Sequence, residues 1–135
     1  MKVEPPLRYV ACARQLPADG IDAFVRETIA ALRREHPAAG APFTLYHGCS
    51  KAGEQVVEVC LPTPGGDNEL PEQELAFTVA RGRECDYPQI LGAYDAVVAF
   101  AAAAGRGVGG AARETYLTDP DATEPQMEVA FPLLP

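Results

Sequence analysis

The amino-acid sequence predicts an α+β fold built from duplicated βαββ units, in which antiparallel strands form a sheet with two helices on one face and a ligand groove on the other. Three features indicate this fold: two stretches with apolar residues at helical spacing, flanking stretches that alternate as half-buried strands do, and a similarity between the two halves. We expect a single domain over residues 1–135, with a first repeat at about 7–62, a linker at 63–72 and a second repeat at about 73–132.

The first repeat contains a strand, a helix and a hairpin. Residues 7–14 alternate and predict a strand. Residues 21–32 place apolar side chains at i, i+3, i+4, i+7, i+8 and i+11, which predicts an amphipathic helix that ends before Pro37. Residues 43–46 and 55–61 then predict two paired strands.

The second repeat follows the same order. Residues 75–81 predict a strand, and Pro88 suits the first turn of a helix whose apolar positions extend over 90–101. Repeated glycines end that helix, because glycine lowers helix stability. Residues 113–117 and 127–131 predict the last hairpin, with a Pro and Asp turn between them.

The two halves of the sequence can be aligned with each other. Residues 20–62 match 90–132 without a gap, and ten of the 43 aligned positions are identical. Alanine matches carry little weight in this composition, so the other identities matter most. They include Gly40/Gly110, Tyr46/Tyr116, Glu58/Glu128, Val59/Val129 and Pro62/Pro132. We interpret the pattern as a duplication, with chance similarity as the alternative.

The duplication predicts which side chains face the helices. Alternation in the two hairpins places one apolar set against the helices, namely Val57, Val59, Leu61, Met127, Val129 and Phe131. Glu58 and Glu128 then lie on the opposite face. Tyr46, Glu114 and Tyr116 share that opposite face if their neighbours Leu45, Thr115 and Leu117 point toward the helices. A groove lined by tyrosines and carboxylates is therefore expected on the face away from the helices.

Composition excludes several classes of function. The net charge of -8 argues against a nucleic-acid-binding surface, which needs clustered Lys and Arg. No apolar run approaches the length of a membrane span, and the first residues lack the apolar region of a signal peptide. We expect a cytoplasmic protein with no membrane partner and no direct contact with nucleic acid.

The four cysteines show no metal-binding spacing. Cys12, Cys49, Cys60 and Cys85 are far apart in the sequence, and the two histidines do not flank them in a zinc pattern. Free cysteine is commonly buried in cytoplasmic proteins. We therefore predict reduced, buried cysteines, no metal site and no cofactor, with a redox or metal role as the alternative.

The C-terminal motif resembles a known family. Residues 113–120 read RETYLTDP and residues 128–132 read EVAFP. This pattern is similar to that of the GyrI-like small-molecule-binding domains, which also occur as effector-binding domains of AraC-type and MerR-type multidrug regulators. The resemblance covers nearly the whole chain. Two departures concern the pocket: residues 84–88 (ECDYP) replace a Gly-Pro-Tyr element, and Met127 replaces a threonine.

The resemblance implies a pocket for lipophilic ligands that are often cationic or planar. Tyrosine faces attract a delocalised cation, and a carboxylate supplies the opposite charge, although burial raises its pKa. The implied ligand-binding residues are Glu114, Tyr116, Glu128, Tyr46, Tyr94 and Tyr87. Glu114 ranks first because the family motif centres on it and because its counterpart in the first repeat is Thr44.

Three functions remain open from the sequence. The first is a standalone small-molecule-binding protein that senses or sequesters toxic compounds, with multidrug binding and a role in transcription regulation implied by the family. The second is a hydrolase of cyclopropane-bearing cytotoxins, with Glu114 as general base and Tyr116 as its catalytic partner. The third is a protein-interaction module such as a gyrase inhibitor. A homodimer through strand edges, or a separate regulatory protein partner, is compatible with each.

Overall fold

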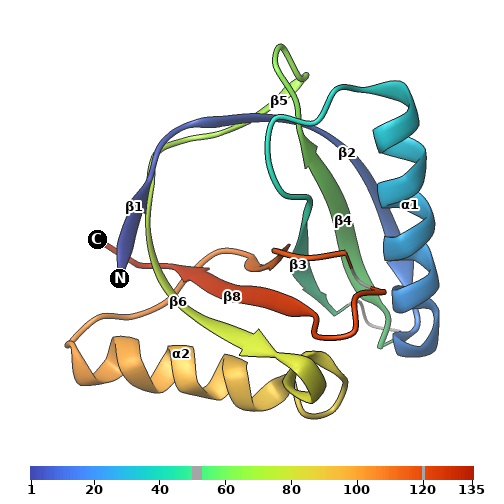
Figure 1. Cartoon of the computed structure of the whole chain (residues 1–135). Coiled ribbons are helices and arrows are strands. Elements are labelled where there is room, and N and C mark those ends of the chain that lie inside the picture. The colour runs from blue at the N-terminus through green and yellow to red at the C-terminus, as the bar shows by residue number, and fades with distance from the viewer. Residues whose placement is uncertain (50–52, 120) are drawn as a thin grey trace.

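A computed structural model describes residues 1–49, 53–119 and 121–135. In these residues eight strands form one antiparallel sheet that curls into a half-barrel, with two α-helices packed against it (Figure 1). The elements, in chain order, are β1 (Lys2–Glu4), β2 (Leu7–Leu16), η1 (Ala18–Gly20), α1 (Ile21–Glu35), β3 (Phe43–Cys49), β4 (Gln55–Pro62), β5 (Asn68–Leu70), β6 (Gln73–Arg81), η2 (Gly82–Cys85), α2 (Leu91–Ala103), β7 (Ala112–Tyr116) and β8 (Gln126–Pro132). The predicted α+β fold class is confirmed.

The predicted elements all form, and the structure adds two short strands. β1 and β5 lie at the two edges of the sheet, and β5 falls inside the stretch predicted as a linker. The turn predicted between β7 and β8 includes Pro120, which lies outside the described residues. Within the described part of the chain, neither helix is long and apolar enough to cross a membrane.

The sheet is symmetric in its strand order. From β1 to β5 the order is β1-β6-β8-β7-β3-β4-β2-β5, so β3 and β7 form the centre and each half repeats outward from them. The edge strands are exchanged between the halves: β1 pairs with β6 of the second half, whereas β5 pairs with β2 of the first half. This arrangement is what two βαββ units related by an approximate twofold axis produce.

The pairing shows how the halves correspond in their first strands. β2 pairs with β5 through Leu7 opposite Leu70, and β6 pairs with β1 through Gln73 opposite Glu4. Tyr9 is opposite Pro62 and Leu75 is opposite Pro132, and because Pro62 and Pro132 are counterparts, Tyr9 and Leu75 are equivalent. The same separation makes Leu7 equivalent to Gln73 and Glu4 equivalent to Leu70. β1 and β5 are therefore equivalent strands, and the predicted linker contains the counterpart of β1.

Each helix covers one end of the sheet. α1 packs on β4 through Phe24, Val25 and Ile29, which contact the fully buried Val57 and Val59. α2 packs on β6 and β8 in a second cluster, whose buried members are Ala76, Ala80, Ile90, Val97, Ala101, Met127 and Val129. A third cluster fills the opposite face of the sheet, with Tyr9, Phe43, Leu45 and Cys60 as its buried members.

The register corrects the predicted position of the groove. Residues directly opposite each other in antiparallel strands lie on the same face. Tyr46 is opposite Val57 and Glu114 is opposite Val129, so both face the helices. The groove was predicted on the face away from the helices, and that part of the prediction is wrong. Its premise failed because Leu45 packs into the third cluster, on the other face.

The position of the groove follows from the spacing of the helices. α1 lies over β2 and β4 and α2 lies over β6 and β8, so the central strands β3 and β7 are left uncovered between them (Figure 1). Polar residues of β3 and β7 on the helix face therefore line an opening between the two helices rather than a helix interface.

Candidate functional site

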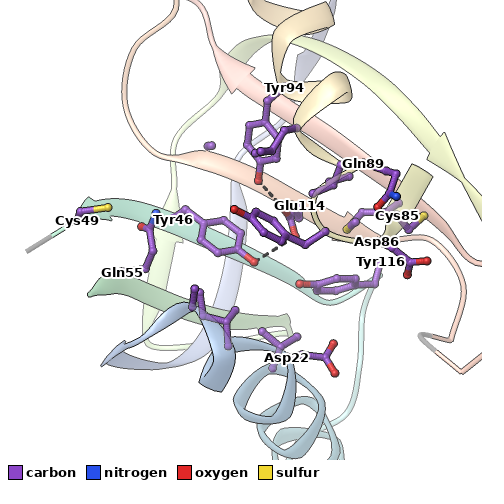
Figure 2. Close-up of a pocket in the computed structure, with 18 of the residues that line it drawn as sticks. Asp22, Tyr46, Cys49, Gln55, Cys85, Asp86, Gln89, Tyr94, Glu114 and Tyr116 are labelled. Atoms are coloured by element: carbon purple, nitrogen blue, oxygen red, sulfur yellow. Dashed lines mark hydrogen bonds between the residues drawn. The ribbon is translucent and has the colours of Figure 1, made fainter. Parts of the chain in front are cut away.

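A large cavity lies between the N-terminal parts of α1 and α2, above β3 and β7. Its volume is about 1270 Å³, which exceeds the roughly 300–1,000 Å³ of most small-molecule pockets. Figure 2 shows the side chains that point into it from both helices and from the central strands. The lining includes Ile21, Asp22, Val25, Arg26, Tyr46, Cys49, Gln55, Cys85, Asp86, Tyr87, Gln89, Ile90, Leu91, Tyr94, Ala112, Glu114, Tyr116 and Met127.

Glu114 lies at the centre of this cavity with both carboxylate oxygens hydrogen-bonded. It projects from β7 and is only 8% exposed. The hydroxyl of Tyr46 donates to Oε1 at 3.1 Å, and the hydroxyl of Tyr94 donates to Oε2. The three side chains point toward one another in Figure 2. Tyr94 is itself oriented by Phe131, whose ring meets it edge to face at 5.8 Å.

Burial dominates the electrostatics of the cluster. Desolvation raises the pKa of Glu114 above its ordinary value of 4.5, although the hydrogen bonds from Tyr94 and Tyr46 act in the opposite direction. Burial also raises the pKa of Tyr46 and Tyr94 far above 10.0, and the nearby Glu114 carboxylate adds to this effect. Both tyrosines therefore remain protonated donors, and Glu114 is the group whose charge is sensitive to what enters the cavity.

The hydrogen bonds around Glu114 follow the approximate symmetry of the sheet. Thr44 and Glu114 are counterparts in the two halves and direct partners in the β3/β7 pair, so the approximate twofold axis passes between them. Tyr46 bonds to Glu114, and its counterpart Tyr116 bonds to Thr44 with an O–O distance of 2.8 Å. The same contact thus occurs twice, once with a carboxylate and once with a hydroxyl. Only one of the two equivalent positions carries a carboxylate, so the buried negative charge belongs to one half of the otherwise symmetric framework.

The helices contribute apolar walls at equivalent positions. Ile21 and Val25 of α1 correspond to Ile90, which precedes α2, and to Tyr94 of α2, because both pairs line the cavity and have the same separation along the sequence. The gapless alignment predicted from the sequence, which places residue 21 on residue 91, is therefore one position out of step in the helices. Where the first half has Val25, the second half has a tyrosine that can bond Glu114.

Charged side chains of α1 and of the β7–β8 connection lie near the rim of the cavity. Arg26 of α1 donates from Nε to Asp22 at 3.0 Å, and its Nη1 binds Asp121 of the β7–β8 connection. This ion pair ties the connection to α1 beside the cavity. Asp86 also lines the rim, so the exposed charges around the opening are mostly negative.

The structure brings four of the six predicted site residues together. Tyr46, Tyr94, Glu114 and Tyr116 converge in the cavity. Tyr87 lines the rim but is 77% exposed, so its ring is free of packing contacts that would hold it against a ligand.

Glu128 is separated from the others by the sheet. It lies on the opposite face, where Lys2 of β1 donates to both of its oxygens at 2.9 and 2.8 Å. The prediction that Glu128 shares a groove with Glu114 is wrong, because Glu128 is opposite Thr115 and Val79 and therefore points away from the helices.

Sequence reasoning missed several residues of the site. Thr44 carries a usable signal, since it is the counterpart of Glu114 and its direct neighbour in the sheet. Ile90 and Met127 were assigned to the core, and both do pack in the cluster below α2 while also reaching the cavity. Asp22, Arg26 and Gln55 carry no signal in the sequence, because only the closeness of the two helix N-termini to the β3–β4 hairpin brings them there.

The cysteines differ from the prediction. Cys60 is buried, but Cys12 and Cys49 are exposed and Cys85 is half-buried. Burial raises the pKa of Cys85, whose thiol donates to the Ala80 and Pro125 carbonyls. In the described ranges, no three His, Cys, Asp or Glu side chains come together as a metal-ligand group.

Comparisons with known proteins identify the fold. No protein-family model and no curated protein matches the chain. The solved EcmrR C-terminal domain matches with a TM-score of 0.77 and 18% identity, covering 98% of this chain and 94% of that one. SAV2435, solved bound to tetraphenylphosphonium, matches with a TM-score of 0.62 and 13% identity over 98% and 92% of the two chains. At these identities the likeness concerns the fold, and the chain has the fold that the resemblance to a GyrI-like effector-binding domain predicts.

Proposed function

We propose that this protein binds a lipophilic organic cation in the cavity between α1 and α2, and so senses or sequesters such compounds. The observation that carries the proposal is Glu114: a carboxylate 8% exposed, in a cavity with apolar walls, flanked by Tyr46 and Tyr94. A buried carboxylate without a cation nearby is costly, and an entering cation removes that cost. The bound tetraphenylphosphonium in SAV2435, which shares this fold, supports the same ligand chemistry.

The hydrogen bonds of Glu114 indicate which cations are favoured. Both oxygens already accept from tyrosine hydroxyls, so the carboxylate offers charge more readily than a new hydrogen bond. A primary ammonium loses its strong hydration on entry and needs acceptors for its donors. A phosphonium, a quaternary ammonium or a delocalised dye loses far less and can also contact the tyrosine faces. We therefore expect such cations to bind more tightly than alkylamines of equal size.

The test compares two ions of the same shape and opposite charge. Tetraphenylphosphonium is expected to bind and raise the melting temperature, whereas tetraphenylborate is expected to do neither. A ligand at about 100 times its Kd adds roughly 2.7 kcal/mol of stability. Calorimetric titration of Glu114→Gln should show loss of the preference for the cation. Glu128→Gln, which removes a carboxylate on the other face of the sheet, serves as the matched control. Equal binding of both ions, or unchanged cation binding by Glu114→Gln, contradicts the proposal.

The hydrolase alternative receives less support from the site. It assigns Glu114 as the base and Tyr116 as its partner. Among the described residues the hydroxyl of Tyr116 bonds to Thr44, and the hydroxyls bonded to Glu114 belong to Tyr46 and Tyr94. Within the described ranges, no contact holds the Tyr116 hydroxyl and the Glu114 carboxylate so that both could act on one water molecule or one substrate atom. The arrangement therefore favours holding a charge over activating water.

A further inference from the structure

A second, smaller cavity lies beside an open strand edge. It occupies about 190 Å³ between β6 and α2, and its lining consists of Thr78, Val79, Ala80, Glu84, Gln89, Gly92, Ala93 and Ala96. β6 pairs with β8 on one side, but β1 covers its other side only at Gln73–Leu75. Over residues 76–81 the outer edge of β6 has no strand partner in the described part of the chain. Such an edge presents unpaired N–H and C=O groups to another chain.

The first half of the protein shows how the equivalent groove is closed. Ala80 corresponds to Arg14 of β2, by the register that relates Gln73 to Leu7, and Ala93 corresponds to Phe24 of α1. The Arg14 guanidinium lies over the Phe24 ring, 5.1 Å from its centre, so this side chain bridges strand and helix. Arg14 also places a charge on the free edge of β2, which discourages pairing with another strand. In the second half two alanines leave both the groove and the edge open.

The outer surface of α2 is also unlike that of α1. Phe100, on the same flank of α2 as Gly92 and Ala96, is 50% exposed, whereas Leu91 and Val98 lie on the opposite flank and are 46% and 43% exposed. Asp95 is the one charged residue among the 13 of α2. α1 carries six exposed charged residues, namely Asp22, Arg26, Glu27, Arg33, Arg34 and Glu35. A helix that is apolar on all sides is normally covered. The same fold therefore has one solvated helix and one helix with a single charge, whose flank beside β6 exposes Phe100.

We propose that β6 and α2 form a twofold interface with a second copy of this chain. In this arrangement β6 pairs antiparallel with β6 of the second copy, and the two α2 helices pack against each other beside the joined sheets. A twofold axis makes each surface meet itself, so one partner covers both the strand edge and the helix face. A strand from an unrelated protein covers the edge but leaves Phe100 exposed.

Charge and shape favour a second copy at this surface. Each chain carries a net charge of -8, so association is easiest where few charges lie. Residues 76–80 carry no charge, Arg81 and Glu84 lie at the end of this edge, and Asp95 is the one charge of α2. Gly92 and Ala96 are small and let a neighbouring helix approach, while Phe100 supplies a large side chain that can lie over the small residues of the other copy.

The size of the surface predicts a weak dimer. α2 is about 20 Å long at 1.5 Å per residue, and the free edge of β6 is also about 20 Å long. The resulting patch is smaller than the roughly 800 Å² per partner of a standard interface, which places it among transient associations. We expect dissociation constants in the micromolar range or weaker. The inference does not depend on the proposed ligand.

Sedimentation and hydrogen exchange test this interface together. Sedimentation equilibrium between about 1 and 500 μM is expected to show a reversible monomer–dimer equilibrium, since transient interfaces dissociate in this range. Amide exchange at residues 76–81 should slow as concentration rises, whereas the equivalent free edge of β2 at 10–16 should not change. Both measurements are made on the unmodified chain.

Matched variants connect the dimer to α2. Ala96→Glu gives α2 the residue that α1 has at the equivalent position, Glu27. It should weaken dimerisation by about tenfold or more, as changes at the centre of an interface do. Ala30→Glu makes the same substitution at an exposed site on α1 and should have no effect. Phe100→Lys is a second variant, and far-ultraviolet circular dichroism confirms that each folds.

Two outcomes overturn the proposal. If the chain remains monomeric at the highest concentration, the proposed dimer is wrong and the β6 edge is available to a strand of another protein. A dimer that Ala96→Glu and Phe100→Lys do not weaken, and that does not protect residues 76–81, has its interface elsewhere.

Discussion

Glu114 combines burial with two hydrogen bonds, and its ionisation therefore affects the stability of the whole fold. In the unfolded chain it titrates near its ordinary pKa of 4.5, and in the folded protein burial raises that pKa. The folded state then binds more protons between these two values. The stabilisation from neutral Glu114 is fully present below pH 4.5 and is lost as the pH rises through the raised folded pKa.

Glu114→Gln tests this dependence. The amide keeps the shape but never ionises, so the variant should be more stable than the wild type at about pH 8, by about 1.4 kcal/mol for each unit by which the pKa is raised. This difference in stability between the variant and the wild type should disappear toward acidic pH. Urea unfolding across this pH range measures it. Glu128→Gln instead removes the partner of Lys2 and should lower stability at neutral pH. A Glu114→Gln variant that is less stable than the wild type at about pH 8 contradicts a raised pKa for Glu114 in the folded protein.

Tyr94 controls the charge of Glu114 through its hydroxyl. Tyr94→Phe keeps the ring and its contact with Phe131 but removes the donor to Oε2. Because that hydrogen bond lowers the pKa of Glu114, its loss should raise the pKa further. The pH above which tetraphenylphosphonium binds fully should then move upward by about one unit, the size expected for one hydrogen bond to a charged group.

Tyr116→Phe is the control for this shift. The Tyr116 hydroxyl bonds to Thr44 rather than to Glu114, so its removal should leave the pH midpoint nearly unchanged. Calorimetric affinities measured at several pH values separate the two variants. Equal shifts in both show that the effect arises from the cavity as a whole rather than from the bond to Oε2.

At the scale of elements, β1 and β5 are equivalent strands with unequal attachments. Glu4 of β1 accepts from the guanidinium of Arg113 at 2.7 Å, and Arg113 is only 4% exposed. Arg8 and Glu69 join β2 to β5 at 3.2 Å, but both side chains are about half exposed. In the first ion pair the charge of Arg113 is buried against the face of the sheet that points away from the helices, whereas the second ion pair lies in solvent.

Glu4→Gln is therefore expected to be the more damaging substitution. Losing one partner of a buried ion pair leaves the other charge uncompensated, and we expect about 2 kcal/mol of destabilisation. Glu69→Gln should cost less than about 0.5 kcal/mol, because exposed pairs contribute little. Denaturant unfolding at neutral pH compares the two. Equal effects contradict this ranking of the two ion pairs.

Over the whole molecule, the cavity is the place where the two halves meet on the helix face. α1 and α2 are both attached to the sheet, and cavity-lining residues come from each. A ligand that fills the cavity contacts Ile21 and Val25 of the first half and Tyr94 and Glu114 of the second. Binding of one ligand should therefore stabilise the cavity-lining turns of both halves at once.

Hydrogen exchange with and without tetraphenylphosphonium measures this coupling. We expect slower exchange in the N-terminal turns of both helices, at 21–26 and 91–96, and little change at their C-terminal ends, which are remote from the cavity. Tetraphenylborate is the control and should protect neither helix. Protection confined to one helix contradicts a ligand that bridges the halves.

The amino-acid sequence by itself determined most of the elements and indicated the duplication and the leading carboxylate. Helical spacing and strand alternation are local patterns, so both helices and the longer strands were predictable. The short strands β1 and β5 were not, because their pairing depends on partners that lie far away along the chain. Glu114 ranks first because the family motif centres on it and because its position breaks the repeat. The structure buries it beside Tyr46 and Tyr94, and its role in binding stays a prediction.

Tertiary structure alone decided which face carries the cavity. Alternation shows that residues share a face but does not say which face meets the helices when both are buried, and here Leu45 and Phe43 pack on one side while Val57 and Val59 pack on the other. That choice moved Glu128 away from the site and brought Thr44, Asp22 and Arg26 into it. The physical reason is that two helices at the ends of one curled sheet leave its centre open.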